Sequence, residues 1–229
     1  MTDAFRDMQY LVLTGNYGSG KTELALNLAL GFSGLSSTTL VDLDIVNPYF
    51  RSGEKAALLQ QAGIRVLMPT YAMTTVDIPA LPAEIQSVFD SGADKVIFDV
   101  GGDDTGAAAL GRYYPSFAAR RGKTAVVFAV NCMRPLTRTV DEITELAERI
   151  RSRGRLAIDI LVNNTNLADQ TTAEMLEEGE ETVLRCAERM GISRVFSTGT
   201  EAVLRNCRLT APAFPVRRFM VPDWMVEEG

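Results

Sequence analysis

The sequence predicts an α/β protein of three layers, in which a doubly wound, mostly parallel sheet carries helices on both faces. Two observations support this fold class. Nearly continuous apolar runs of strand length alternate along the chain with segments of helical pattern. The 229 residues are 46% hydrophobic and 23% charged, enough to bury a sizeable core, and no repeat, low-complexity run or linker divides them. We therefore expect a single domain over residues 1–229.

The expected strands are short apolar runs, and most are followed by a segment with the periodicity of a helix. Strands are expected at 10–14, 38–42, 64–68, 95–99, 124–130, 156–162 and 194–197. Helices are expected at 23–30, 54–62, 80–91, 107–121, 137–153 and 172–190. Pro115 should break or bend the fourth of these helices. Arg217 and Arg218 favour a basic strand edge, with contact to a nucleotide or a partner as the alternative.

The composition argues against several classes of function. A net charge of −6 and a pI near 4.9 do not favour broad nucleic-acid binding, which depends on lysine and arginine. The chain has no histidine, so any chemistry must rest on carboxylates, lysine, arginine, backbone groups and a bound cation. Cys132, Cys186 and Cys207 are too few and too scattered for a disulfide framework or a zinc site, and we expect reduced thiols. Residues 1–9 lack an apolar signal core and no stretch is long enough to span a bilayer, so we expect a cytoplasmic protein without a membrane segment.

Residues 15–22 read GNYGSGKT and fit the pattern G-x-x-x-x-G-K-[ST]. Glycines allow backbone angles and a close approach that let successive N–H groups surround a phosphate. Lys21 is expected to reach the β and γ phosphates, and the Thr22 hydroxyl to ligate Mg²⁺. An apolar strand precedes the motif and a helix follows it, with the positive end of the helix dipole toward the phosphates. The alternative is a glycine-rich turn that only links the strand to the helix.

The second expected strand ends in two acids, Asp42 and Asp44, which lie on the same side of an extended chain. Ligands of parallel sheets lie at the carboxyl ends of the strands, so these acids are candidates for chemistry. Asp44 lies further out and is expected to orient an attacking water or to hold a water of the Mg²⁺ shell. Solvated acids at a strand end are the alternative.

The fourth expected strand closes on Asp99, the usual position of a Mg²⁺-associated aspartate. The spacing Asp99-x-x-Gly102 also lets the Gly102 N–H approach a γ-phosphate. Asp103 and Asp104 either touch a substrate or metal, or start the next helix near its positive end.

Asparagines follow the sixth expected strand. Asn163 has donors and acceptors that can read a purine edge, although asparagine is also a common loop residue. The run Asn166-Leu-Ala-Asp169 has the outline of the guanine-reading Asn-Lys-x-Asp element but lacks its lysine, which weakens the case for GTP. The residues expected to contact a nucleotide are Gly15, Asn16, Tyr17, Gly18, Ser19, Gly20, Lys21, Thr22, Glu23, Gly102 and Asn163.

Together, the motifs at residues 15–22, 42–48, 99–102 and 163 resemble the MinD/ParA-type branch of the SIMIBI-class P-loop NTPases. The resemblance covers nearly the whole chain. It implies ATP with Mg²⁺ at the sheet edge, with Lys21 and Thr22 on the phosphates and metal. It also implies Asp44 near the attacking water, Asp99 in the metal shell and Asn163 near adenine.

The chain departs from this family at two places. Asn16 stands where the family usually has a lysine that reaches across a dimer to the partner's nucleotide, so a homodimer is possible but not required. Residues 222–229 are acidic and contain proline, whereas membrane-binding members end in a basic amphipathic helix, so no membrane binding is expected.

Three functions remain open at this point. The first is a slow Mg²⁺-dependent ATPase that switches a protein partner or delivers a cargo. The second is a nucleotide-gated binding module that hydrolyses little ATP. The third is a small-molecule kinase or an ATP-dependent ligase, with an acceptor pocket formed by Asp103, Asp104, Arg112 and the loop 69–79.

Overall fold

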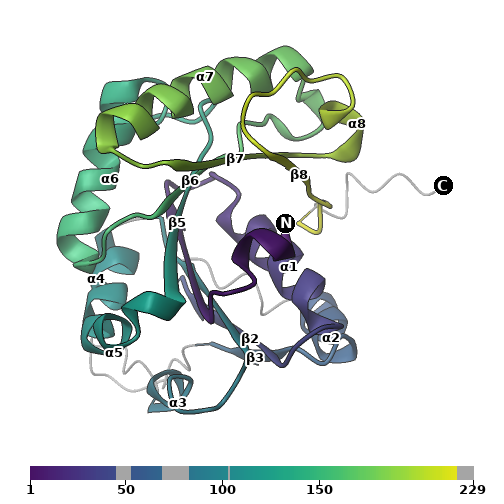
Figure 1. Cartoon of the computed structure of the whole chain (residues 1–229). Helices are drawn as coiled ribbons and strands as arrows, with labels where there is room; N and C mark the ends of the chain where they lie inside the picture. Colours follow the sequence, from purple (N-terminus) through teal and green to yellow (C-terminus); the bar gives the residue numbers. More distant parts are fainter. Residues whose placement is uncertain (45–52, 69–82, 103, 221–229) are drawn as a thin grey trace.

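The computed structural model describes residues 1–44, 53–68, 83–102 and 104–220. Within them, eight strands form one sheet in the order β3-β2-β4-β1-β5-β6-β7-β8, and every neighbouring pair is parallel (Figure 1). The strands are β1 (Tyr10–Gly15), β2 (Thr38–Leu43), β3 (Arg65–Leu67), β4 (Lys95–Val100), β5 (Thr124–Val130), β6 (Ile160–Asn163), β7 (Arg194–Gly199) and β8 (Ala213–Pro215).

Helices cover both faces of this sheet, which confirms the predicted α/β doubly wound architecture (Figure 1). The α-helices are α1 (Lys21–Ser33), α2 (Gly53–Gln61), α3 (Ala83–Ser87), α4 (Asp104–Arg112), α5 (Tyr114–Ala119), α6 (Val140–Gly154), α7 (Ala173–Met190) and α8 (Glu201–Leu204). Short 3-10 helices are η1 (Thr2–Phe5), η3 (Arg121–Lys123) and η4 (Ala168–Gln170).

The alternation of side chains along the strands divides the interior into two hydrophobic cores. Tyr10 and Val12 of β1 belong to the core that α4, α5, α6 and α7 cover. Leu11 and Leu13 belong to the core beneath α1, with Phe5 of η1 at its edge. Both faces of the sheet are therefore buried, which explains why its central strands read as continuous apolar runs. No helix in the described ranges has the length and apolarity needed to cross a membrane.

Several element boundaries differ from the sequence predictions. The helix expected at 107–121 is two helices, α4 and α5, and Pro115 lies in the first turn of α5, where a missing N–H costs nothing. β6 begins at Ile160 and not at residue 156, and α6 begins after a capping box between Thr139 and Glu142. The eighth strand, β8, was not predicted, because a three-residue strand carries no periodicity to detect.

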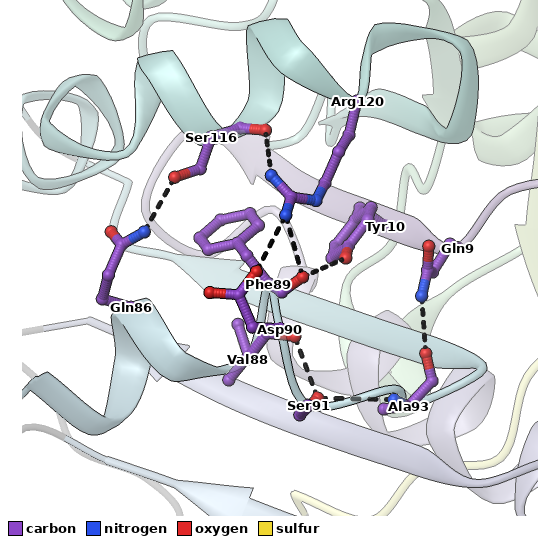
Figure 2. Close-up of polar contacts among 10 residues, drawn as sticks. All are labelled: Gln9, Tyr10, Gln86, Val88, Phe89, Asp90, Ser91, Ala93, Ser116 and Arg120. Carbon is purple, nitrogen blue, oxygen red and sulfur yellow. Dashed lines mark hydrogen bonds and ion pairs between the residues drawn. The ribbon is translucent and has the colours of Figure 1, made fainter.

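A cluster around Arg120 ties the segment after α3 to the sheet and to α5 (Figure 2). The guanidinium donates to the carbonyl oxygen of Phe89 at 3.1 Å and to the carboxylate of Asp90 at 3.0 Å. It also lies over the Phe89 ring, 5.5 Å from the centroid. The Tyr10 hydroxyl donates to the same Phe89 carbonyl oxygen at 3.3 Å, so side chains from β1 and from the residue after α5 bind one carbonyl group (Figure 2).

Lys95 fixes the N-terminal segment to the amino end of β4. Its buried ammonium donates to the carbonyl oxygens of Phe5, Arg6 and Met8 at 3.0, 2.6 and 2.5 Å. The ammonium also lies 4.8 Å from the centroid of the Phe32 ring of α1. One cation therefore binds three carbonyl oxygens at the end of η1 and in the turn that follows it.

We expect Lys95→Met to lower the free energy of unfolding by about 2–3 kcal/mol, because the substitution keeps the apolar stem but removes a charged donor from three carbonyl oxygens. Urea denaturation measures the effect. Lys123→Met is the matched control, since Lys123 is exposed, and it should change stability by less than about 0.5 kcal/mol. Equal losses in the two variants would contradict this role of Lys95.

Candidate functional site

The glycine-rich loop joins β1 to α1 at the carboxyl end of the central strand. Gly15, Gly18 and Gly20 have φ angles of +146°, +71° and +81°, which L side chains rarely adopt. A Cβ atom at Gly15 would lie 2.3 Å from the Ala129 carbonyl oxygen, and one at Gly20 would lie 2.2 Å from the Asn164 amide nitrogen. Both positions therefore require glycine for conformation and for space.

Side chains from outside the loop hold its carbonyl groups. The Asn164 side-chain amide donates to the Ser19 carbonyl oxygen at 2.8 Å, and the Asn131 amide donates to the Gly18 carbonyl oxygen at 3.4 Å. In a planar trans peptide the next N–H points away from the carbonyl. The N–H groups of Ser19 and Gly20 are therefore turned to the other side of the loop.

Lys21 reaches back over the loop. Its ammonium, largely buried, donates to the Asn16 carbonyl oxygen at 2.8 Å, and the Ser19 N–H donates to the same oxygen at 3.2 Å. Gly102 lies against this arrangement, because a Cβ there would be 2.5 Å from the Tyr17 nitrogen and 3.0 Å from the Lys21 ammonium. The structure thus brings Lys21 and Gly102 together, as their predicted common role requires.

Thr22 and Asp99 meet at the start of α1. The Thr22 hydroxyl donates to the Asp99 carboxylate at 2.6 Å. Burial raises the pKa of Asp99 to about 6, the charge of Asp44 adds to the rise, and Lys21 and the Thr22 hydrogen bond oppose it. A cation placed beside such a carboxylate would stabilise its ionised form and lower its pKa.

The two acids after β2 occupy different environments. Asp42 is buried and pairs in register with Asp99 of β4, and its carboxylate accepts the Asp44 N–H at 2.8 Å. Asp44 is half-buried and reaches the cavity described below. Asn47, Pro48 and Arg51 lie outside the described residues, as do Asp103 and the loop 69–79.

A cavity of about 640 Å³ extends from the glycine-rich loop toward the carboxyl ends of β6 and β7. Its size suits a cofactor or small molecule. The cavity is lined by six of the predicted nucleotide contacts and by the predicted catalytic acid Asp44. The six contacts are Tyr17, Gly18, Gly20, Lys21, Thr22 and Glu23. Its other walls are formed by Leu24, Arg134, Pro135, Asn164, Thr165, Asn166, Ala168, Thr171, Thr198, Gly199, Thr200, Val203, Val216, Arg218 and Met220.

The structure does not bring Asn163 to this cavity. Its side chain is fully buried and donates to the Leu176 carbonyl oxygen at 3.0 Å and to the Ser197 hydroxyl at 3.2 Å. Ser197 in turn donates to the buried carboxylate of Glu180. The expected contact of Asn163 with adenine therefore needs correction, because the last residue of β6 faces α7 and the next residue, Asn164, faces the loop.

Glu23 has a different setting from the one expected of a nucleotide contact. Although it lines the cavity, its carboxylate accepts the N–H groups of Phe219 and Met220 at 2.6 and 2.9 Å. Glu23 thereby attaches the C-terminal part of the described chain to α1.

Some residues around the loop were not predicted. Asn131 directly follows β5, and Thr198 and Thr200 lie at the end of β7, so the rule that ligands lie at the carboxyl ends of parallel strands points to all three. Arg134 donates to the Gly18 carbonyl oxygen at 3.3 Å. Arg218 was expected at a strand edge, with contact to a nucleotide or a partner as the alternative; it lies after β8, outside any strand, and lines the cavity.

Comparisons with known proteins bear on the fold. No protein-family model and no curated protein sequence matches the chain. Its structure is similar to that of the cell division protein FtsY of Thermotoga maritima, at 14% identity over 83% of this chain and 62% of that chain, with a TM-score of 0.53. It is also similar to a nucleotide-binding protein of Archaeoglobus fulgidus in complex with ADP, at 14% identity over 87% and 84% of the chains, with a TM-score of 0.50. The chain has the P-loop NTPase fold.

A third similar structure is the signal recognition particle 54 kDa protein of Aeropyrum pernix K1 in complex with GDP, at 21% identity over 83% of this chain and 42% of that chain, with a TM-score of 0.50. The chain thus spans less than two thirds of this protein and of FtsY. In P-loop NTPases the loop between β1 and α1 is the phosphate-binding P-loop, and residues 15–22 are called the P-loop below.

Titration of Asp99 gives a test of the geometry of this site. Its pKa is about 6 in the folded protein against an ordinary value of 3.8, so the folded state binds the proton more tightly than the unfolded chain does. The resulting stability is fully present below the ordinary value and is lost as the pH rises through about 6. In metal-free buffer we expect wild type to lose about 2 kcal/mol of unfolding free energy relative to Asp99→Asn between pH 4 and pH 7. Parallel pH profiles for the two proteins, measured by chemical denaturation, would contradict the raised pKa.

Proposed function

We propose that the chain binds a purine nucleoside triphosphate, ATP, together with Mg²⁺, and hydrolyses it slowly to switch a protein partner or deliver a cargo. The observation that carries this proposal is the P-loop itself. Its carbonyl groups are held from outside, Lys21 lies over it, and Thr22 with Asp99 stands at the start of α1. The resemblance to MinD/ParA-type proteins supports ATP over GTP, and the chain carries Asn166-Leu-Ala-Asp169 without the lysine of the guanine-reading element.

The phosphates would be bound by the P-loop amides and by Lys21. At present the Asn16 carbonyl accepts from both the Lys21 ammonium and the Ser19 N–H, so a bound phosphate would take over donors that are already gathered at one point. The short distance from Gly102 to Tyr17 and Lys21 supports a position of the Gly102 backbone beside the terminal phosphate. The P-loop would then surround the β-phosphate, as such loops do.

The residues near Thr22 fit a magnesium ion. A hydroxyl and a carboxylate are hard oxygen ligands, and Mg²⁺ is commonly bound by one or two such groups plus phosphate oxygens and water. Thr22 and Asp99 supply them 2.6 Å apart. The buried hydroxyl of Ser19 also has no hydrogen-bond partner among the described residues, as expected of a group that awaits a ligand. The cation would neutralise phosphate charge and raise the acidity of its bound water.

Hydrolysis would depend on Asp44. The acidic side chains in the described cavity wall are Glu23 and Asp44, and Oε1 of Glu23 is held by the backbone N–H groups of Phe219 and Met220. Since the chain has no histidine, Asp44 is the acid in place to orient a water. If the protein binds ATP but Asp44 does not promote hydrolysis, the protein would be a nucleotide-gated binding module. A kinase or ligase activity would involve Asp103 and the loop 69–79, which lie outside the described residues, and stays a prediction.

The geometry around Asn16 supports a nucleotide site completed within one chain. The Asn16 side-chain amide donates to the Pro135 carbonyl oxygen at 2.7 Å, and its oxygen accepts the Tyr17 N–H at 2.8 Å. Both polar ends of this side chain are thus engaged within its own chain. A homodimer remains possible, but hydrolysis would not require one. We propose a single domain in the cytoplasm, without broad nucleic-acid binding or membrane attachment.

We expect Lys21→Ala to weaken binding of ATP and Mg²⁺ by about a hundredfold, because it removes a charged donor to the phosphates. Asp44→Ala should leave binding nearly intact and lower phosphate release by about a hundredfold. Calorimetric titration and a phosphate-release assay separate the two effects. Lys123→Ala and Asp3→Ala are exposed charge controls and should behave as wild type.

Two outcomes decide between the alternatives. Binding of ATP with equal, negligible turnover in wild type and Asp44→Ala would favour the binding module. Wild-type protein that binds neither ATP nor GTP would remove the proposed function altogether.

Gly102→Ala tests the contact between β4 and the P-loop. A Cβ atom 2.5 Å from the Tyr17 nitrogen forces the P-loop or the Gly102 backbone to shift, and we expect ATP affinity to fall by about tenfold. Gly34→Ala is the matched control, because nothing lies within 4 Å of a Cβ at Gly34 and its φ is −82°. Equal ATP affinities in these two variants would show that the P-loop does not depend on this contact.

A further inference from the structure

The cavity is walled in part by a turn after β6 and by the segment after β8. Ala168 and Thr171 line it from the turn, and Val216, Arg218 and Met220 line it from the segment. An ion pair joins the two walls: the Arg218 guanidinium donates to the Asp169 carboxylate. Arg218 is in the cavity wall, whereas Asp169 is not and its side chain is 64% exposed, so the ion pair engages the carboxylate outside the cavity lining.

The backbone that carries Arg218 is fixed on both sides. The Asn27 side chain of α1 donates to the Arg217 carbonyl oxygen and accepts the Arg217 N–H, both at 2.8 Å. Beyond Arg218, the Glu23 carboxylate accepts the N–H groups of Phe219 and Met220. The side chain of Arg218, only 25% exposed, therefore starts from a fixed point and extends to the opposite wall.

The turn that carries Asp169 is also fixed. The Thr171 hydroxyl donates to the Ala168 carbonyl oxygen at 2.7 Å and accepts the Leu167 N–H at 3.0 Å. The Asn166 side chain accepts the Ala168 N–H at 3.3 Å, and Ala168 has a φ of +53°. Asp169 is the only acid in residues 164–171. Asp169 is therefore the residue of this turn that can present a carboxylate.

Guanine and adenine differ in the hydrogen-bonding groups that they present to such a carboxylate. Guanine presents adjacent N–H donors on its pairing edge, and an ionised carboxylate accepts from both. Adenine presents an amino group next to a ring nitrogen that is an acceptor, and a carboxylate facing that nitrogen would be repelled. An arginine, which has only donors, favours the adenine nitrogen when it occupies the same place. The choice of base thus depends on whether Asp169 or Arg218 faces it.

We propose that the Arg218–Asp169 ion pair selects the base: Arg218 keeps the Asp169 carboxylate from reading guanine and so makes the site an adenine nucleotide site. This inference rests on the proposed function, since it concerns the base of the same bound nucleotide. Removal of Arg218 exposes the carboxylate to the cavity and converts the preference toward guanine.

The test is the ratio of GTP to ATP affinity, measured by calorimetric titration with non-hydrolysable analogues and Mg²⁺. We expect wild type to prefer ATP, and Arg218→Ala to shift the ratio toward GTP by at least about tenfold. The double variant Arg218→Ala with Asp169→Asn should lose the shift, because a neutral amide cannot accept from both guanine donors. Arg218→Gln, which keeps a long side chain in the wall, is measured alongside in case the alanine variant is unstable, and should shift the ratio in the same direction.

Arg217→Ala is the matched control. It removes the same charge from the neighbouring residue, whose exposed side chain does not line the cavity, and should leave the ratio unchanged. If the ratio in both Arg218 variants stays within about twofold of wild type, or if the shift survives in the double variant, the base-selection proposal is overturned while nucleotide binding stands. If wild type binds neither nucleotide, both proposals fail together.

Discussion

The rest of the candidate site depends on hydrogen bonds that hold the P-loop from outside. Side chains after β5 and β6 donate to the carbonyl oxygens of Gly18 and Ser19, and within the loop Lys21 donates to that of Asn16. With these carbonyls committed, the peptide planes of the loop have one orientation available, and the following N–H groups turn to the opposite side. The concave surface for a phosphate is therefore a property of the surrounding sheet as much as of the glycines.

The strand order explains how these partners reach the loop. β1 lies between β4 and β5, and β6 follows β5, so the carboxyl ends of four adjacent strands surround the start of α1. β4 brings Asp99 to Thr22 and Gly102 to Lys21, whereas β5 and β6 bring Asn131 and Asn164. The continuation past β7 and β8 then places Arg218 in the wall of the cavity. Residues separated by up to 200 positions thus share one edge of the sheet because every strand runs in the same direction.

The fold and the P-loop could be predicted because short continuous segments of the sequence carry the pattern of each. Apolar runs locate the central strands, and the spacing of Gly15, Gly20, Lys21 and Thr22 places a phosphate loop at a strand end. Asp99 was expected beside Thr22 because it closes an apolar run, and the two are hydrogen-bonded. The contact of Asn163 with adenine was the wrong expectation, since a shift of one residue along the strand end decides which side a side chain faces.

Other features depend on contacts between distant segments, which a single sequence does not record. The bond of Glu23 to Phe219 and Met220 and the ion pair of Arg218 with Asp169 join residues about 50 to 200 positions apart. Likewise, β8 forms because its three residues complete the sheet next to β7, and not because of their own pattern. Contacts between segments that are distant in the sequence are therefore the features that the sequence alone predicts least well.

A crystal structure with a non-hydrolysable ATP analogue and Mg²⁺ tests the central claim most directly. The account predicts a triphosphate inside the P-loop, with its β-phosphate on the amides of residues 18–22, the Lys21 ammonium moved from the Asn16 carbonyl to a phosphate oxygen, and Thr22 beside the cation. A P-loop that keeps its internal hydrogen bonds while the analogue lies elsewhere, or does not bind at all, would contradict it.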